Sequence, residues 1–313
     1  MAPSVRLAKF LMKLWQTHPD DQFGDIGEIF NKPEFKSASD QTQSEISTRM
    51  AELRFQSENN VPYESYFGID LSPYFRNQFV LDFGCSNGAL ARSVIERYEP
   101  RNLVGVDLNI DRVRSAKLFF GGHGLESNFL AYGGKVLPFE DEVFDTIYSF
   151  DVFEHVSNLE DSLKECYRVL KPGGRLLAVF PGFFHPKEHH LSLVTKTPFV
   201  HYFFRPKTLA EAYFQIIDER GQDAAWYQRP SRKFEPWERS YTINGMTKHG
   251  FRRLAKKLGF GIELDHALAL FETGRMRRAN PLLGLFVPVF RFLGSILFLE
   301  EVFTHRIVMI LHK

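Results

Sequence analysis

Short apolar runs alternate with segments of helical periodicity through the middle of the chain. Four runs have the length and apolar character of buried strands, at residues 79–83, 103–107, 144–150 and 175–180. Between them, residues 89–98 and 159–170 repeat apolar side chains at helical spacing. A strand, a helix and a second strand in this order form a βαβ unit with parallel strands. The pattern therefore predicts an α/β fold.

The first strand runs into a loop that contains two glycines. Asp82 is followed by Gly84 and Gly88, and a helical pattern begins directly after Gly88. Glycine lets the backbone turn tightly and lets a ligand approach it, and a helix start offers unpaired N–H groups. The second strand ends in Asp107, an acid that can bridge the two hydroxyls of a ribose. These features predict a site for a nucleotide-type ligand.

The spacing of the glycines separates two kinds of cofactor. Dinucleotide sites use the pattern G-x-G-x-x-G, with the helix aimed at a pyrophosphate. Here the order is Asp-x-Gly-x-x-x-Gly, so the third glycine is missing. Asp82 would repel a pyrophosphate but would attract the amino group of a ligand. A cationic amino-acid nucleoside therefore fits this loop better than NAD.

Four sequence blocks carry a resemblance to a known family. They are residues 80–88, 104–107, 137–147 and 169–176. Across residues 79–180 the chain resembles the class I S-adenosylmethionine-dependent methyltransferases with a methyltransferase 11 type core. The resemblance implies a Rossmann-like, seven-stranded, mostly parallel sheet with helices on both faces. It also implies S-adenosyl-L-methionine as cofactor and S-adenosyl-L-homocysteine as product, and it does not identify the methyl acceptor.

The same resemblance implies which residues contact the cofactor. They are Asp82, Gly84, Cys85, Ser86, Gly88, Asp107, Leu108, Gly133, Gly134, Ser149 and Asp151. The chain departs from the family at Gly133 and Gly134, where an acid that accepts from the adenine amino group and a small residue are expected. Adenine would then be held by backbone groups and apolar walls, or by another side chain.

The resemblance also divides the chain into four parts. They are a helical N-terminal extension or cap (1–75), the first part of the cofactor-binding core (76–181), a lid or substrate insertion after the fifth strand (182–241), and the completion of the core (242–313). The insertion is rich in aromatic residues, which either wall an acceptor pocket or form a small satellite core. In the extension, apolar residues recur at helical spacing between Val5 and Trp15. This helix packs on its own domain or covers the substrate pocket, or it touches a membrane.

Histidines gather directly after the fifth strand. His185, His189 and His190 are candidate general bases, because histidine titrates near neutral pH and an alcohol must lose its proton when it is methylated. Glu154 and His155, after the fourth strand, are further catalytic candidates, or they cap or pack the helix that follows. The segment from His185 to His189 matches an inverse zincin pattern, which needs a helix, and Pro186 argues against one. We predict no metal site, although a divalent ion that assists O-methyl transfer stays open.

Charge and cysteine content narrow the class of protein. The chain has 39 basic and 38 acidic residues, so no strong field favours nucleic acid as a partner. Its two cysteines, Cys85 and Cys166, indicate neither a disulfide framework nor a zinc cluster. Basic residues interrupt the apolar residues of the N-terminus, which argues against a signal peptide. We therefore expect a cytoplasmic protein. The sequence does not predict its oligomeric state.

The C-terminal part contains a long apolar segment. Residues 281–299 are nearly all apolar and approach the roughly 20 residues that a bilayer span needs. Residues 306–311 follow as a strand, which the resemblance places antiparallel beside the fifth strand. If that strand joins the sheet, the apolar segment cannot cross a membrane and return. We expect a helical hairpin that packs on the lid or rests on a membrane surface, which would give peripheral membrane contact.

Several functions remain open from the sequence. We expect O-methylation of a small molecule, a sugar or a glycan by an S-adenosylmethionine-dependent methyltransferase. The alternatives are a membrane-associated lipid or quinone methyltransferase and a non-catalytic S-adenosylmethionine-binding protein. NAD-linked oxidation is a third alternative, which the glycine spacing disfavours.

Overall fold

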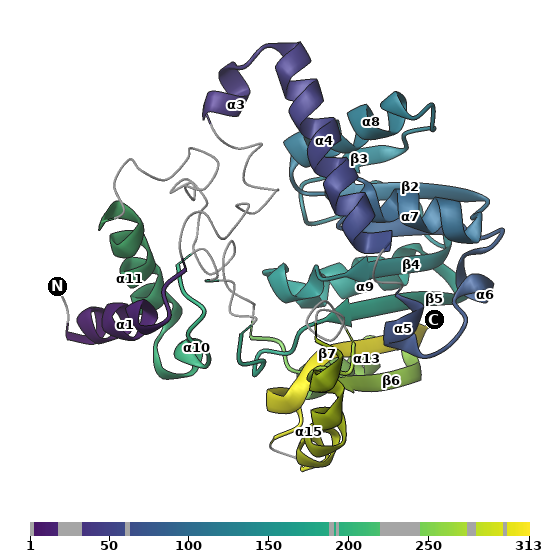
Figure 1. Ribbon diagram of the computed structural model, residues 1–313. Coiled ribbons are helices and arrows are strands. Elements are labelled where there is room, and N and C mark those ends of the chain that lie inside the picture. The colour runs from purple at the N-terminus through teal and green to yellow at the C-terminus, as the bar shows by residue number, and fades with distance from the viewer. Residues whose placement is uncertain are drawn as a thin grey trace.

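The computed structural model describes residues 3–17, 33–59, 63–187, 191, 194–219, 245–273, 280–296 and 299–313. In these ranges the strands form one seven-stranded sheet of order β3-β2-β1-β4-β5-β7-β6 (Figure 1). The strands are β1 (Phe79–Phe83), β2 (Asn102–Asp107), β3 (Phe129–Ala131), β4 (Phe144–Phe150), β5 (Leu170–Phe180), β6 (Gly261–Ala269) and β7 (Thr304–His312).

The pairing of the strands agrees with the predicted fold class. β1 pairs in parallel with β2 and β4, and β5 pairs in parallel with β4. β7 is antiparallel to both β5 and β6, and Phe180 of β5 lies opposite Ile307 of β7. The predicted antiparallel strand beside the fifth is therefore confirmed, and with it the mixed seven-stranded sheet.

Helices cover both faces of the sheet. One face carries α4 (Asp40–Asn59), α5 (Glu64–Phe67), α6 (Ser72–Phe75), α7 (Ala89–Tyr98) and α8 (Ile110–Gly122). The other carries α9 (Leu159–Val169) and α13 (Lys248–Lys257). Two shorter elements are α3 (Pro33–Ser37) and the 3-10 helix η2 (Phe153–His155).

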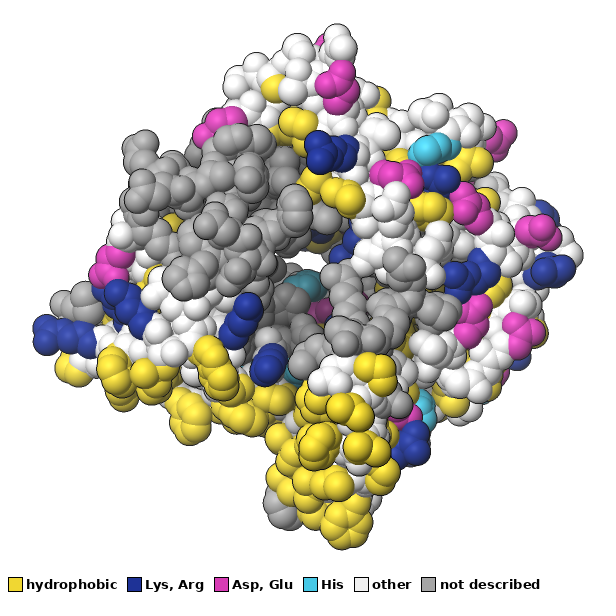
Figure 2. Space-filling model, in the orientation of Figure 1, with side chains coloured by type: hydrophobic (Ala, Val, Ile, Leu, Met, Phe, Trp, Pro, Cys, Tyr) yellow, Lys and Arg dark blue, Asp and Glu magenta, His cyan; other side chains and the backbone are white. Residues whose placement is uncertain are grey.

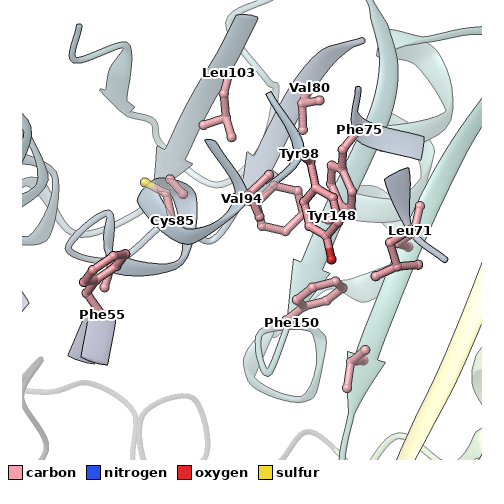
Figure 3. Close-up of a cluster of buried hydrophobic side chains, with 14 of the residues drawn as sticks. Phe55, Leu71, Phe75, Val80, Cys85, Val94, Tyr98, Leu103, Tyr148 and Phe150 are labelled. Atoms are coloured by element: carbon pink, nitrogen blue, oxygen red, sulfur yellow. The ribbon is translucent and has the colours of Figure 1, made fainter. Parts of the chain in front are cut away.

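Successive side chains of β1 enter the cores on the two opposite faces of the sheet. Val80 points into the cluster under α7 and α8, whereas Leu81 and Phe83 point into the cluster under α9 and α13. Figure 3 shows the first cluster, in which Phe75 stacks on Tyr98 with ring centroids 4.9 Å apart. Each large apolar side chain buried in this way contributes about 1.5–3 kcal/mol to folding. Both faces of β1 are thus buried, as a central parallel strand requires.

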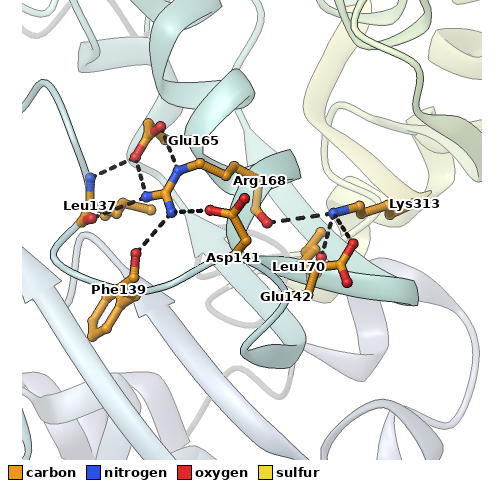
Figure 4. A network of polar contacts seen from close by, with 8 residues as sticks. All are labelled: Leu137, Phe139, Asp141, Glu142, Glu165, Arg168, Leu170 and Lys313. Atoms are coloured by element: carbon orange, nitrogen blue, oxygen red, sulfur yellow. Dashed lines mark hydrogen bonds and ion pairs between the residues drawn. The ribbon is translucent and has the colours of Figure 1, made fainter.

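A network around Arg168 holds the loop between β3 and β4 on α9 (Figure 4). The guanidinium donates to Glu165, to Asp141 and to the carbonyl oxygens of Leu137 and Phe139. Glu165 also accepts from the backbone N–H of Leu137 at 2.8 Å. The hydrogen bonds from Arg168 hold the pKa of Glu165 below its usual range. This loop includes Gly133 and Gly134, so the network supports one wall of the predicted cofactor site.

A third, smaller core lies outside the sheet. Helix α1 (Pro3–Leu14) packs Val5, Ala8 and Met12 against α10 (Val200–Phe203) and α11 (Pro206–Glu219). Lys9 and Lys13 both form ion pairs with Glu219. One face of the N-terminal helix therefore packs on the segment that follows β5, and the described aromatic residue Tyr213 belongs to this satellite core.

The apolar C-terminal segment forms short helices rather than a helical hairpin. It contains the 3-10 helix η5 (Pro281–Phe286), α15 (Val287–Gly294) and the 3-10 helix η6 (Glu301–Phe303). Pro288 and Gly294 limit the length of α15, because proline is tolerated in a helix only near its start and glycine favours its end. Phe290 packs against Phe271 and Phe303, so the contacts of α15 go to the β6 side of the sheet instead of to α10 and α11. Within the described ranges, no helix combines the length and apolar character that crossing a bilayer requires.

Candidate functional site

The loop after β1 is bound tightly against β2. The N–H groups of Gly84 and Cys85 both donate to the carbonyl oxygen of Val106, at 2.8 and 2.9 Å. Gly84 has a φ of +91° and Gly88 a φ of +77°. A β-carbon on Gly84 would lie 2.5 Å from Cγ2 of Val152. Both the backbone conformation and the space therefore require glycine at position 84.

Asp82 is a buried carboxylate at the end of β1. Only 2% of the residue is exposed, and no hydrogen-bond partner for its Oδ2 occurs among the described residues. Burial raises the pKa of Asp82 to about 7. The Tyr148 hydroxyl lowers this pKa in part, and the charge of the nearby Asp107 raises it. A buried carboxylate oxygen without a hydrogen bond is costly, so Oδ2 is suited to a cationic ligand group.

Asp107 connects the end of β2 to the glycine loop. Its Oδ2 accepts from the N–H of Ser86 at 3.0 Å, and its Oδ1 accepts from the N–H of Asn109 at 2.8 Å. Asn109 in turn caps α8 by accepting from Asp111 and Arg112. These bonds fix the carboxylate beside the loop, where the lone pairs that remain can accept from a ligand.

Leu108 and Gly134 lie together beside Asp107. The Leu108 side chain is 64% exposed, and a β-carbon on Gly134 would lie 2.9 Å from its Cδ2. At Gly133 an added β-carbon would meet nothing within 4 Å. The two glycines thus leave room next to an exposed apolar side chain, an arrangement that suits a flat apolar ligand group.

Cys85 offers only its backbone to a ligand. Its side chain is buried in the core cluster under α7 and α8. Burial raises the pKa of the thiol well above its usual value. A neutral, buried thiol takes no part in ionic binding.

The end of β4 carries Ser149 and Asp151. Ser149 is fully buried, and its Oγ has no hydrogen-bond partner within the part of the chain that the structure describes. Asp151 adopts a φ of +55°, and its N–H donates to Val179 at 2.7 Å. Its Oδ1 lies 3.0 Å from Nε of Arg306 on β7. Positive φ at a residue other than glycine is a mark of functional loops, so the position is consistent with a binding site.

Glu154 and His155 follow within η2. Glu154 is almost fully buried, and its Oε1 lies 3.9 Å from Nε2 of His155. The His155 side chain is 34% exposed. The pair therefore joins a buried carboxylate to a partly accessible imidazole, which is compatible with either the catalytic or the packing interpretation.

His185 lies beyond the end of β5 in a cluster of rings. It is buried, and its Nδ1 accepts from the N–H of Lys187 at 3.1 Å. Its ring centroid is 6.3 Å from that of His305, and His305 is 6.3 Å from Tyr66. His189 and His190 lie outside the described residues, as does Glu188 of the zincin-like pattern.

Four residues near the predicted site were not anticipated from the sequence. Arg306 and His305 come from the start of β7, and Tyr63 and Tyr66 come from the region of α5. Tyr63 stacks on Phe150 of β4 with centroids 4.4 Å apart. The only available signal was the expected position of the last strand beside the fifth, which brings residues just before 307 to the end of β5.

These residues fit S-adenosylmethionine. The cofactor has an ammonium group, a ribose with two hydroxyls and an adenine ring. The structure offers an unpartnered buried oxygen on Asp82, a carboxylate on Asp107, and an apolar wall at Leu108 beside two glycines. The backbone of the glycine loop can approach the ligand because Gly84 and Gly88 carry no side chain.

Comparison with known proteins supports this assignment. A family model described as a methyltransferase domain matches residues 81–178. Malonyl-[acyl-carrier protein] O-methyltransferase 1 of Coxiella burnetii is 32% identical over 139 residues, which are 44% of this chain and 45% of that protein. 24-methylenesterol C-methyltransferase 2 of Arabidopsis thaliana is 36% identical, over 34% of this chain and 29% of that protein. Demethylmenaquinone methyltransferase of Thermus thermophilus is 34% identical, over 36% of this chain and 52% of that protein.

The curated relatives match over only part of their own length, and the family model matches the middle of this chain. Each covers about half of the relative's length or less. The family model covers most of β1 and β5 and all of β2, β3 and β4, and therefore the glycine loop and Asp107. Residues 81–178 of this chain are therefore a methyltransferase domain, and the sheet that contains them is the seven-stranded, Rossmann-like sheet expected of the class I S-adenosylmethionine-dependent methyltransferases.

Proposed function

We propose that this protein transfers a methyl group from S-adenosylmethionine to an oxygen atom of a small-molecule acceptor. The observation that carries the proposal is the buried carboxylate of Asp82, whose Oδ2 has no partner among the described residues and which lies beside a glycine loop tied to Asp107. A ligand with a positive charge and a ribose would satisfy both acids. The family match over the same residues supports this cofactor.

Each residue of the cofactor site would have a separate role. Asp82 would hold the ammonium group, Asp107 would accept from the ribose hydroxyls, and Leu108 would cover the adenine beside Gly134. Ser149 and Asp151 would contact the methionine part. When bound, the cofactor supplies a methyl group on a sulfonium, which an oxygen nucleophile can attack in line. These residues would act by binding and orienting the cofactor, which accounts for much of the rate of such transfers.

His185 and His305, which lie beyond the end of β5, would bind the acceptor and remove its proton. In neutral His185 the proton is on Nε2, because Nδ1 accepts the N–H of Lys187. His185 is therefore better suited to donate a hydrogen bond to the acceptor than to remove its proton. We propose His305, the titratable ring beside it, as the base. His189, His190, His155 and Glu154 stay candidates from the sequence.

One observation favours a lipid or quinone as the acceptor class. Large apolar side chains are exposed on α1, on α10 and on the segment from η5 to α15. Two of the relatives are named for a sterol and for demethylmenaquinone, whose chemistry is apolar. The alternative acceptor is a sugar or another polar metabolite, which partition between organic and aqueous phases distinguishes from a lipid or quinone.

The test uses methyl-labelled S-adenosylmethionine and an extract of source cells. After incubation, label is measured separately in the organic and aqueous phases, with the variant Gly84→Leu as the blank. We expect label in the organic phase, above the blank. Label only in the aqueous phase would replace the lipid acceptor by a polar one. No label in either phase, with S-adenosylhomocysteine still bound, would support the non-catalytic alternative.

A further inference from the structure

Exposed apolar side chains gather on one edge of the molecule. Figure 2 shows them along the lower edge of the view, over α1 and α10 and over the projecting segment of η5 and α15. We call this surface the apolar edge and define it by Leu7, Phe10, Leu14, Trp15, Phe199, Phe203, Leu282, Leu285, Phe286, Val289 and Phe292. We infer that the apolar edge docks on the surface of an anionic lipid bilayer.

Helix α1 has two apolar faces, and only one is used inside the protein. Val5, Ala8 and Met12 are buried against α11. On the opposite face, Leu7, Phe10 and Leu14 are between 53% and 63% exposed, and Trp15 follows them at 62%. Single exposed apolar residues are common on protein surfaces, but a contiguous row marks an interaction site. Tryptophan is enriched at membrane interfaces because its ring is both apolar and a hydrogen-bond donor.

The segment of η5 and α15 contributes the second part. None of the residues in these two helices is buried. Leu282 and Leu285 are 69% and 74% exposed, and Phe292 is 69% exposed. At 1.5 Å per residue, the eight residues of α15 span about 12 Å, well below the roughly 30 Å of a hydrocarbon core. This helix can therefore enter the interface of a bilayer without crossing it.

The charge around the apolar edge complements an anionic surface. Residues 3–17 contain Arg6, Lys9 and Lys13 and no acidic residue, and residues 194–210 contain Lys196, Arg205 and Lys207 and no acidic residue. Lys9 and Lys13 pair with Glu219, whereas Lys196, Arg205 and Lys207 are exposed beside Phe199 and Phe203. Residues 280–299 contain Arg291, which pairs with Glu272, and no acidic residue. A basic residue near an anionic membrane surface contributes about 1 kcal/mol to binding.

The shape of the apolar edge favours a lipid surface over a second protein. In Figure 2 the segment of α15 projects from the body of the molecule, and its side chains point outward. A bilayer accommodates projecting phenylalanine and leucine side chains without a matching groove, whereas a protein partner would need one. The inference goes beyond the proposed methyl transfer and does not depend on it, because membrane binding can be measured without cofactor or acceptor.

The test is flotation of the full chain with vesicles of phosphatidylcholine, with and without phosphatidylglycerol, at low and high salt. We expect the protein to float with the anionic vesicles at low salt and to float much less with phosphatidylcholine alone. The double variants Phe10→Ser with Leu14→Ser, and Leu285→Ser with Phe292→Ser, should each lower the partition coefficient by about tenfold or more. Their exposed positions leave the fold intact, which circular dichroism and S-adenosylhomocysteine binding would verify.

Matched control variants change the same kinds of side chain outside the apolar edge, so they show whether the location of the change matters. Ile110→Ser with Leu53→Ser removes two exposed apolar side chains from α8 and α4, away from the apolar edge, and should bind vesicles as the wild type does. Lys196→Glu with Lys207→Glu should abolish the preference for anionic vesicles. Arg114→Glu with Lys117→Glu makes the same charge change on α8 and should retain it.

Two results would overturn the inference. One is a wild-type protein that stays in the aqueous fraction with every vesicle composition. The other is equal binding of the wild type and both apolar-edge variants. If ultracentrifugation instead shows a dimer that these variants dissociate, and vesicles are not bound, the apolar edge is an interface between two copies of this chain.

Discussion

Arg306, near the start of β7, forms an ion pair with Asp151, directly after β4, with Nε 3.0 Å from Oδ1. The pair connects two strands that are not neighbours in the sheet, since β5 lies between them. Asp151 has a positive φ, and Arg306 is the partner that holds its side chain in place. The last strand thereby stabilises the edge of the proposed cofactor site.

Arg306→Ala should weaken cofactor binding. The side chains of Arg306 and Asp151 are 14% and 32% exposed, so removing the arginine leaves a mostly buried carboxylate without its counter-ion. We expect the affinity for S-adenosylhomocysteine to fall by about tenfold, which corresponds to about 1.4 kcal/mol. Isothermal titration calorimetry measures this directly. Arg306→Lys, which keeps the charge, should retain most of the affinity, and an unchanged affinity in Arg306→Ala would rule out the role assigned to the pair.

Gly84→Ala should abolish cofactor binding, because it strains a backbone with positive φ and because the added β-carbon has no room. A β-carbon would meet Val152 at 2.5 Å, at a φ of +91°. Gly173→Ala is the matched control, because Gly173 also has a positive φ, of +77°, but its β-carbon would meet nothing within 4 Å. We expect the control to cost about 1 kcal/mol of stability and to bind S-adenosylhomocysteine normally. Equal loss of binding in both variants would show a general loss of stability rather than an effect specific to Gly84.

Cofactor affinity should rise with pH around neutrality. The pKa of Asp82 is raised to about 7 by burial, and only the deprotonated form attracts an ammonium group. Affinity for S-adenosylhomocysteine should therefore increase between pH 6 and pH 8, with release of a proton on binding at the lower pH. Titrations in buffers of different ionisation enthalpy measure that proton.

The same shift has the opposite effect on the empty protein. A carboxyl group with a raised pKa binds more protons in the folded state, so its contribution to stability is present at low pH and is lost as the pH rises through about 7. Glu301, whose pKa burial also raises to about 7, titrates in the same range. Asp82→Asn isolates the contribution of Asp82: it should bind more weakly at pH 8 and should flatten the pH dependence of binding. A persistent slope would assign the effect to another group.

Substitution of the rings beyond β5 should lower turnover without changing cofactor binding. We expect His305→Gln to reduce kcat by about 10²- to 10⁴-fold, the usual contribution of a general base. His185→Gln should have a smaller effect, since its proposed role is to orient the acceptor. His123→Gln, at the C-terminal cap of α8, is the control and should leave kcat unchanged. Normal turnover in His305→Gln would return the assignment to the other histidine candidates.

The residues proposed to hold the cofactor could be picked out from the sequence, and the structure brings them together, because they are local in sequence. Asp82, Gly84 and Gly88 lie within seven consecutive positions, and a strand, a turn and a helix start are enough to arrange them. Asp107 ends the next strand, so its position could be predicted from the local pattern in the same way. Periodicity and glycine spacing carry this information directly.

The acceptor half could not be predicted in the same way. His305 and Arg306 reach the site only because β7 pairs with β5 in the register that sets Ile307 opposite Phe180. Tyr66 comes from a four-residue helix far from both in the sequence. No local pattern specifies a contact that depends on the order and register of strands.

Helix α1 illustrates the same difference. Its periodicity predicted a helix, but its partner α11 lies far along the chain, and Lys9 and Glu219 are 210 positions apart. Apolar residues on both faces of α1 left open which face would be buried. Only the packing of Val5, Ala8 and Met12 decides it.

The position of β7 constrains the order in which the fold can form. β7 lies between β5 and β6 in the sheet, although the ribosome makes it after both. Until β7 emerges, β6 has no strand to pair with, and the edge of β5 remains open. The nascent protein must therefore keep the unpaired edges of β5 and β6 apart until β7 has been made, a period in which they are vulnerable to aggregation.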